Sequence, residues 1–147
     1  MSKKIYWSTE NVEMPTLDFQ LLEKWIVTVA AQFQKKCGEI AYCFSDDHKI
    51  IQVNRQFLQH DYYTDIITFD YSTKHTISGD ILISLDTVHS NALLFNQPYE
   101  RELLRVIIHG ILHLCGINDK TPQERLTMEN AENQALLTYA ELSQTNP

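Results

Sequence analysis

His109 and His113 lie four residues apart in a nearly apolar stretch, LLRVIIHGILHLCG, and this spacing could serve one metal ion. Residues four apart on a helix project from the same face, so the two imidazoles can meet on a shared ion. Imidazoles among apolar side chains also need partners for their ring nitrogens, which a metal ion and nearby acceptors would supply. The pair predicts a metal site, and the alternative is two core histidines satisfied by hydrogen bonds.

Asp119 is the third ligand that we expect. Gly116 stands where a helix commonly ends in a left-handed residue, which would let the chain turn back and bring Asp119 to the ion. Cys115 should point to the opposite side of the helix and pack there. Two imidazoles and one carboxylate leave a position for water, as in catalytic zinc sites rather than closed structural ones.

Spacing alone leaves more than one metal chemistry open. In peptidases of the HExxH type, the residue after the first histidine is the general-base glutamate, and here that residue is Gly110. The chain therefore lacks the base of that mechanism. Two histidines and a carboxylate also form the facial triad of non-haem iron oxygenases, so a hydrolase and an oxygenase are both compatible with these ligands.

The elements that must position these residues follow from the apolar patterns. Short alternating or β-branched runs predict strands at residues 5–7, 39–44, 66–71 and 80–85. Amphipathic runs predict helices that begin at Thr16 as N-cap, near residues 47, 86 and 98, and at Thr121, which forms a capping box with Glu124. We expect an α+β fold in which residues 1–147 form a single metal-dependent hydrolase domain. It should have a small mixed sheet of about four strands, about five helices, and a metal site on a helix and the loop that follows it.

The net charge of −7 argues against indiscriminate affinity for nucleic acid, because such binding depends on Lys and Arg side chains that neutralise phosphates. A small local RNA site stays compatible with this charge. The three cysteines have no CxxC spacing, and no apolar segment typical of a secretion signal stands near the start, so a reducing cytoplasm is expected. No apolar run approaches the roughly 20 residues that span a bilayer, and no membrane partner is expected.

Four segments follow one another along the chain: VN at 53–54, TDIITF at 64–69, GDI at 79–81 and HGILHLCG at 109–116. In motif, order and interval they resemble the YbeY family of metal-dependent endoribonucleases involved in rRNA maturation. The pattern of that family is roughly an Asn-containing helix, then TDVLSF, GDI and HGxLHLxGxDH.

The resemblance implies an endoribonuclease that acts on single-stranded rRNA in small-subunit maturation and ribosome quality control. It implies one divalent metal ion, most simply Zn²⁺, and the small ribosomal subunit or its associated proteins as partners, with no DNA expected. Two alternatives stay open: a non-catalytic ribosome-assembly factor with a structural metal, and a metal hydrolase that acts on another substrate.

Two departures from the family pattern bear on the site. The family's third ligand is a histidine ten residues after the first, and Asp119 holds that place, with Asn118 where the family has Asp. The family also carries a functionally important Arg four residues after the Asn, and here that residue is Leu58. Arg55 and His60 are the nearby residues that could bind phosphate instead.

The residues expected at the site are therefore as follows. His109, His113 and Asp119 are the metal ligands. Asp80 and Arg55 are the catalytic candidates. Arg55, His60, Thr64 and Asp65 are the candidates for substrate binding, with backbone capping or turn stabilisation as the alternative for Asp65.

Overall fold

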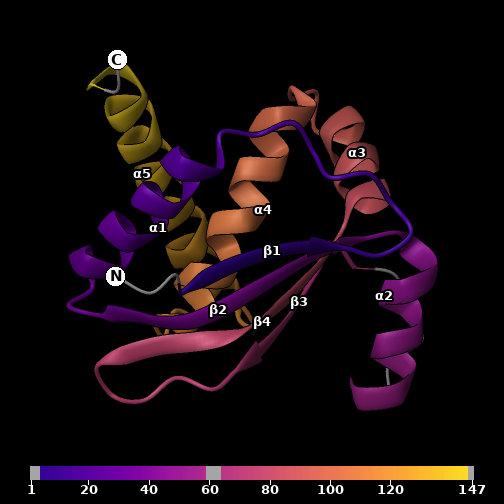
Figure 1. Ribbon diagram of the computed structural model, residues 1–147, viewed down its shortest axis with the longest axis horizontal. Coiled ribbons are helices and arrows are strands. Elements are labelled where there is room, and N and C mark those ends of the chain that lie inside the picture. The colour runs from indigo at the N-terminus through magenta and orange to yellow at the C-terminus, as the bar shows by residue number, and fades with distance from the viewer. Residues whose placement is uncertain (1–3, 59–63, 146–147) are drawn as a thin grey trace.

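The computed structural model describes residues 4–58 and 64–145, and a four-stranded sheet forms its centre (Figure 1). The strands are β1 (Ile5–Thr9), β2 (Lys36–Ser45), β3 (Ile66–Asp70) and β4 (Thr76–Ser84), in the order β1-β2-β4-β3. The pairs β1·β2 and β2·β4 are parallel, and β3·β4 is antiparallel. The mixed sheet expected from the sequence is confirmed.

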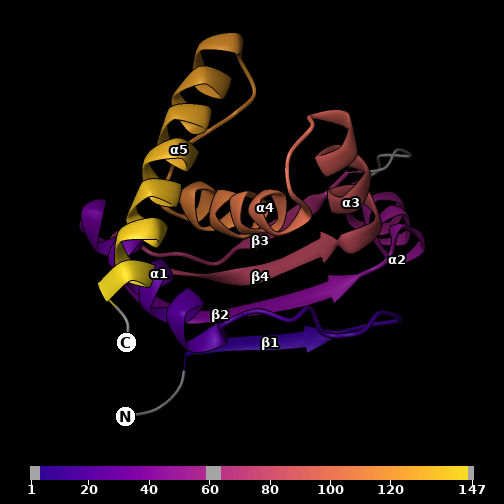
Figure 2. The same cartoon turned by 90° about the horizontal axis from the view of Figure 1, so that it is seen from above.

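The described residues form five α-helices: α1 (Phe19–Gln32), α2 (Asp47–Val53), α3 (Leu85–Leu94), α4 (Tyr99–Leu114) and α5 (Pro122–Thr145). A π-helical turn, η1 (Asn54–Leu58), continues α2. Figure 1 shows α1, α3, α4 and α5 above one face of the sheet and α2 beyond one end of it. Seen from above in Figure 2, α4 lies over the sheet between α3 and α5. The α+β fold with five helices is therefore confirmed.

The first and last helices begin in different ways. The cap of α1 is Asp18 rather than the expected Thr16, because Asp18 has an extended backbone and its Oδ1 accepts a hydrogen bond from the Leu21 amide at 3.1 Å. The capping box of α5 is confirmed. Thr121 Oγ1 accepts from the Glu124 amide at 3.1 Å, and Glu124 Oε1 accepts from the Thr121 amide at 3.0 Å.

Helix α4 is buried along most of its length and carries the two histidines across the sheet. Gly110 allows the close approach, because a Cβ atom there would lie 2.9 Å from Ile81 Cδ1 on β4 and 3.2 Å from Ile66 Cδ1 on β3. Tyr42 on β2 donates its hydroxyl to the Ile107 carbonyl at 2.8 Å and so ties the sheet to the same helix. These contacts place His109 and His113 above β3.

Helix α5 packs against both α1 and α4. Trp25, fully buried on α1, donates its indole N–H to the Ala135 carbonyl of α5 at 2.7 Å. Packing against α1 and α4 therefore orders α5.

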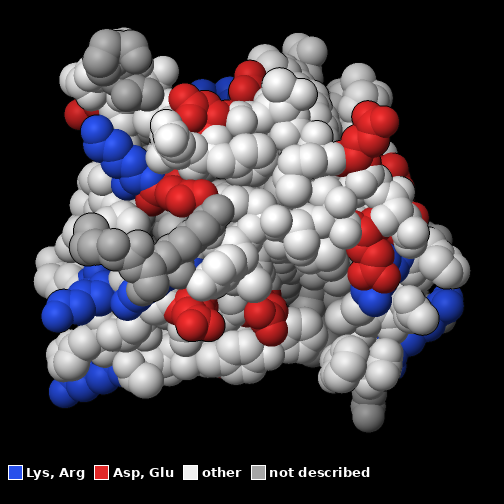
Figure 3. Space-filling view, viewed as in Figure 1, with Lys and Arg blue, Asp and Glu red and all other residues white. Residues whose placement is uncertain are grey.

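Charge is unevenly distributed on the face seen in Figure 3, where Lys and Arg gather mostly toward the two ends and Asp and Glu lie between them. This face offers no continuous basic surface for nucleic acid among the residues that the structure describes. On this face, then, affinity for RNA would have to come from a smaller site. In the part of the chain that is described, no helix is both long and apolar enough to cross a bilayer.

Candidate metal centre

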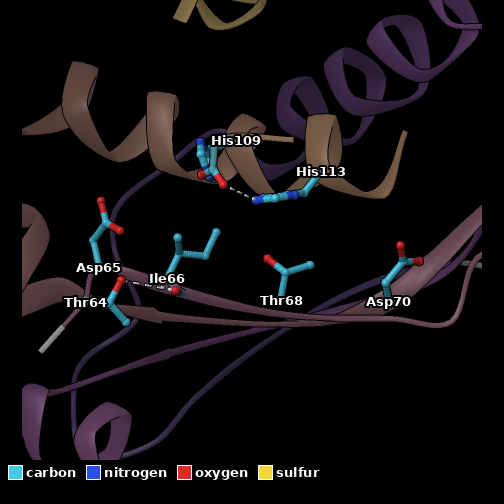
Figure 4. Close-up of a pocket in the computed structure, with 8 residues that line it drawn as sticks. Thr64, Asp65, Ile66, Thr68, Asp70, His109 and His113 are labelled. Atoms are coloured by element: carbon cyan, nitrogen blue, oxygen red, sulfur yellow. Dashed lines mark hydrogen bonds and ion pairs between the residues drawn. The ribbon is translucent and has the colours of Figure 1, made fainter. Parts of the chain in front are cut away.

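Three side chains converge where α4 ends. His109 Nε2 lies 3.2 Å from Asp119 Oδ2, and His113 Nε2 lies 3.4 Å from Asp119 Oδ1. One ligand atom from each residue lies within 4.8 Å of the others. Figure 4 shows both imidazoles projecting from α4 on the side that faces strand β3. The sequence prediction that these three residues come together is confirmed.

The spacing of these atoms suits a divalent cation. Two atoms each about 2.1 Å from a tetrahedral zinc ion lie about 3.4 Å apart, close to the observed separations. The donor set of two imidazole nitrogens and a carboxylate oxygen is one that zinc accepts. No fourth His, Cys, Asp or Glu joins the group among the described residues. His109, His113 and Asp119 could therefore hold a metal ion and leave a coordination position free for solvent or substrate.

The loop that brings Asp119 back to the helix starts at a left-handed glycine. Gly116 has φ of +103°, its amide donates to the His113 carbonyl at 3.0 Å, and the Ile117 amide donates to the Leu112 carbonyl at 3.1 Å. These two bonds form the Schellman motif at the end of α4. The expected reversal of the chain at Gly116 is confirmed.

A second carboxylate, not predicted from the sequence, lies behind His109. Glu132 Oε2 lies 2.6 Å from His109 Nδ1, and Glu132 Oε1 accepts from Arg105 Nη1 at 2.8 Å. An ionised Glu132 accepts the Nδ1 hydrogen, so the lone pair of Nε2 is directed at the metal position. The signal in the sequence is the position of Glu132 among the buried residues Met128, Ala135 and Leu136 of α5. A carboxylate on an apolar stripe must have a partner inside the protein.

The electrostatic surroundings of His109 favour positive charge. Burial alone would lower the pKa of His109, but the hydrogen bond to Glu132 and the charges of Glu132, Asp119 and Asp65 outweigh it, so this pKa is raised. The same negative charges attract a divalent cation to Nε2. A proton and a metal ion therefore compete for this ring.

A cavity of about 320 Å³ opens beside the triad. Its floor is one side of β3, where Ile66, Thr68 and Asp70 alternate along the strand beneath the histidines (Figure 4). Thr64 and Asp65, both expected to bind substrate, line the same cavity just before the strand. Thr68 and Asp70 were not expected there, although the alternation of the strand indicates that they share a face with Ile66.

Asp65, like Asp70, lines the cavity without being one of the three clustered ligands. Burial raises the pKa of Asp65, and the nearby His109 lowers it in part. The side chain of Asn91 lies 3.5 Å from Asp65 Oδ2, and the Asp65 carbonyl accepts from the Ser84 amide at 2.9 Å. The main-chain carbonyl of Asp65 is thus bonded to the end of β4, while its side chain lines the cavity.

The other expected residues lie away from the triad or outside the described chain. Asp80 accepts from the Tyr71 hydroxyl at 3.2 Å, and its neighbours Gly79 and Ile81 face α4, so Asp80 points to the opposite face of the sheet. Arg55 is exposed on η1 and does not line the cavity beside the triad. The catalytic roles of both stay predictions, and the geometry does not bring either to the triad.

Two of the expected positions lie beyond the described residues or away from the triad. His60 lies outside the described residues, and so does the side chain of Leu58. Cys115 packs against the core rather than joining the ligands, and burial raises the pKa of its thiol to about 11. A thiol with such a pKa stays protonated and is a poor ligand, as expected.

Known proteins match most of this chain. Residues 5–140 match the family model described as Endoribonuclease YbeY. Endoribonuclease YbeY of Phocaeicola vulgatus is 64% identical over 132 residues, which cover 90% of this chain and 96% of the relative. Endoribonuclease YbeY of Porphyromonas gingivalis strain ATCC 33277 is 50% identical over 138 residues, with 94% and 91% covered. The solution structure of TM1509 from Thermotoga maritima has a TM-score of 0.66 at 27% identity, and the match covers 97% of this chain and 93% of that one.

Proposed function

The chain belongs to the YbeY family of endoribonucleases, and from this membership we propose that it cleaves single-stranded rRNA in small-subunit maturation and ribosome quality control. The observation that carries the proposal is the convergence of His109, His113 and Asp119 beside an open cavity. The proposal includes the small ribosomal subunit or its proteins as partners and the cytoplasm as the place of action.

We assign His109, His113 and Asp119 as ligands of one divalent ion, most simply Zn²⁺. When bound, such an ion polarises a scissile phosphate and lowers the pKa of a water molecule. Glu132 keeps the hydrogen of His109 on Nδ1, so that Nε2 faces the ligand position. Thr64 and Asp65 present oxygen atoms to the cavity, where they can contact the substrate.

The openness of the site favours a catalytic role for the metal ion over a structural one. Structural zinc sites are usually closed by four protein ligands, whereas catalytic sites have three and an open position. Here the side chains of His109, His113 and Asp119 are 19%, 32% and 33% exposed, and the cavity reaches all of them.

A non-catalytic assembly factor is the second candidate, and Leu58 at the family's arginine position is the observation that favours it. The two candidates differ in turnover. An assembly factor would bind the small subunit and leave rRNA fragments intact when fully loaded with metal.

Two measurements test the proposal. Metal-loaded protein should cut single-stranded rRNA fragments, and His113→Ala should abolish the cleavage while His75→Ala, at an exposed histidine of the β3–β4 hairpin, should not. Cleavage that survives in His113→Ala would identify a contaminating nuclease. Elemental analysis should find about one metal ion per chain, and none in Asp119→Ala. Full occupancy in that variant would refute the ligand set.

A further inference from the structure

A second groove shares two walls with the metal centre. It has a volume of about 560 Å³, and His109 and Asp119 line it as they line the cavity over β3. The groove runs between α4 and α5 and reaches Phe95 at the end of α3. A molecule bound in this groove would therefore lie directly beside the metal ligands.

Three arginines line this groove, and two of them can bind a ligand. Arg105 is already bonded to Glu132 and Asn133, at 2.8 and 2.7 Å. Arg101 is exposed and makes no hydrogen bond or ion pair with any described residue. Arg125 is exposed and, among acceptors in the described residues, its side chain bonds only to the Lys120 carbonyl, through Nη1 at 2.9 Å. Their remaining N–H groups can donate to phosphate oxygens.

Four carboxylates line the groove with the three arginines, and two of the four are buried. Glu132 is held by Arg105 and His109, and Glu102 is 6% exposed. Glu129 is exposed and is the carboxylate that solvent reaches most freely among them. Asp119 is the fourth carboxylate of the groove, and its side chain is 33% exposed. Arg101 and Arg125 therefore offer accessible N–H donors beside the accessible carboxylates of Glu129 and Asp119, in a chain whose net charge is −7.

Phe95 adds an aromatic surface to the same groove. Its side chain is 57% exposed, and it follows Leu93 and Leu94, which are 73% and 76% exposed. Proteins that bind single-stranded RNA combine cations along the backbone with aromatic rings on which bases stack. Phe95 and the two arginines supply both elements within one groove.

We propose that the groove lined by Phe95, Arg101 and Arg125 binds the single-stranded RNA segment next to the cleaved phosphate. The arginines contact backbone phosphates and Phe95 stacks on a base. This inference rests on the proposed function and deepens it. The groove also supplies cations that Leu58 cannot, since the family's arginine is absent from that position.

The test measures binding and cleavage separately. Binding of a fluorescent single-stranded RNA oligonucleotide to chelator-treated protein is titrated at several salt concentrations for wild type, Arg101→Gln with Arg125→Gln, and Phe95→Ala. Loss of two phosphate contacts should reduce the slope of log affinity against log salt by about 1.4. Phe95→Ala should weaken binding by about 5-fold to 150-fold, the range for one stacked base.

The matched control is Lys24→Gln with Lys36→Gln, which removes the same charge from two exposed lysines that do not line the groove. It should keep nearly the wild-type slope. Metal content and melting temperature verify that each variant folds. If Arg125→Gln disturbs the neighbouring Asp119 loop, the single Arg101→Gln variant gives the answer, because Arg101 has no bond within the described protein to lose.

The possible results distinguish a failure of the groove assignment from a failure of the proposed function. If wild type cleaves RNA but the arginine variant matches the lysine control, the groove assignment is overturned and the proposed function stands. If wild type neither binds nor cleaves RNA, the proposed function fails and the groove assignment fails with it.

Discussion

Glu132 Oε2 lies 2.6 Å from His109 Nδ1, although the two residues belong to different helices and are 23 positions apart. The contact joins α5 to the metal centre and determines which nitrogen of His109 faces Asp119. Carboxylates in this position fix the tautomer of a metal-binding histidine and increase its basicity. The ligand cluster on α4 and its loop therefore depends on a helix that contributes no ligand.

Glu132→Gln should lower zinc affinity by about 10-fold to 100-fold, the usual effect of removing such a partner. The amide can still accept a hydrogen bond, but it lacks the negative charge that favours a cation on Nε2. Competition with a fluorescent zinc chelator measures the change.

Two controls isolate the contact with His109. Glu129→Gln changes an exposed glutamate of the same helix and should leave zinc affinity unchanged. Arg105→Gln breaks the ion pair with Glu132 but keeps the carboxylate on the imidazole, so its effect should be smaller. Equal losses in Glu132→Gln and Arg105→Gln would mean that the ion pair, rather than the histidine contact, maintains the site.

Asp119→His should retain metal binding and shift selectivity toward Zn²⁺ over Mn²⁺. The change restores the third imidazole of the family pattern, and imidazole suits zinc whereas carboxylate also suits harder ions. Affinities for both ions, measured by competition, give the selectivity ratio. A ratio that stays at its wild-type value would show that Asp119 does not set metal preference.

The triad could be predicted because each of its determinants is local. Four-residue spacing places His109 and His113 on one face of a helix, and the left-handed Gly116 reverses the chain toward Asp119. The position of Glu132 beside His109, by contrast, depends on how α5 packs across α4. This packing is set by contacts between residues far apart in the sequence, such as the one between Trp25 and the Ala135 carbonyl.

The placement of Asp80 could not be obtained from its motif alone. Alternation along β4 shows that Asp80 and Gly79 point to opposite faces, but it does not say which face α4 covers. The fit of Gly110 against Ile81 decides this. Likewise, a strand pattern predicts Ile66 and Thr68 on one side of β3 without revealing that this side is the floor of the site.

Asp65→Asn should stabilise the metal-free protein at pH 7. Burial raises the pKa of Asp65 above its unfolded value, with partial opposition from His109. The folded state then binds the proton more tightly than the unfolded chain does, so the stabilising contribution of Asp65 is present at low pH and is lost as pH rises through the folded pKa. Asparagine keeps a neutral side chain at every pH.

Urea midpoints of wild type and Asp65→Asn, measured with chelator present, test this pH dependence. The stability gain should be clear at pH 7 and should shrink toward pH 4, near the unfolded pKa of about 3.9. A gain of the same size at both pH values would contradict burial of the charge as its cause, and a loss at pH 7 would show that the ionised form is needed for folding.

Thr121→Ala should cost about 1 kcal/mol of folding stability, the usual cost of losing an N-cap side chain. That corresponds to a fall of about 3 °C in the melting temperature for a chain of this size. The matched control is Thr127→Ala, where an exposed threonine inside α5 bonds the Gln123 carbonyl and alanine has the higher helix propensity, so stability should be unchanged or slightly raised. Because Thr121 begins the helix only two residues after Asp119, Thr121→Ala should also weaken zinc binding. Unchanged zinc affinity alongside the expected loss of stability would show that the Schellman turn at Gly116 orders the Asp119 loop without help from α5.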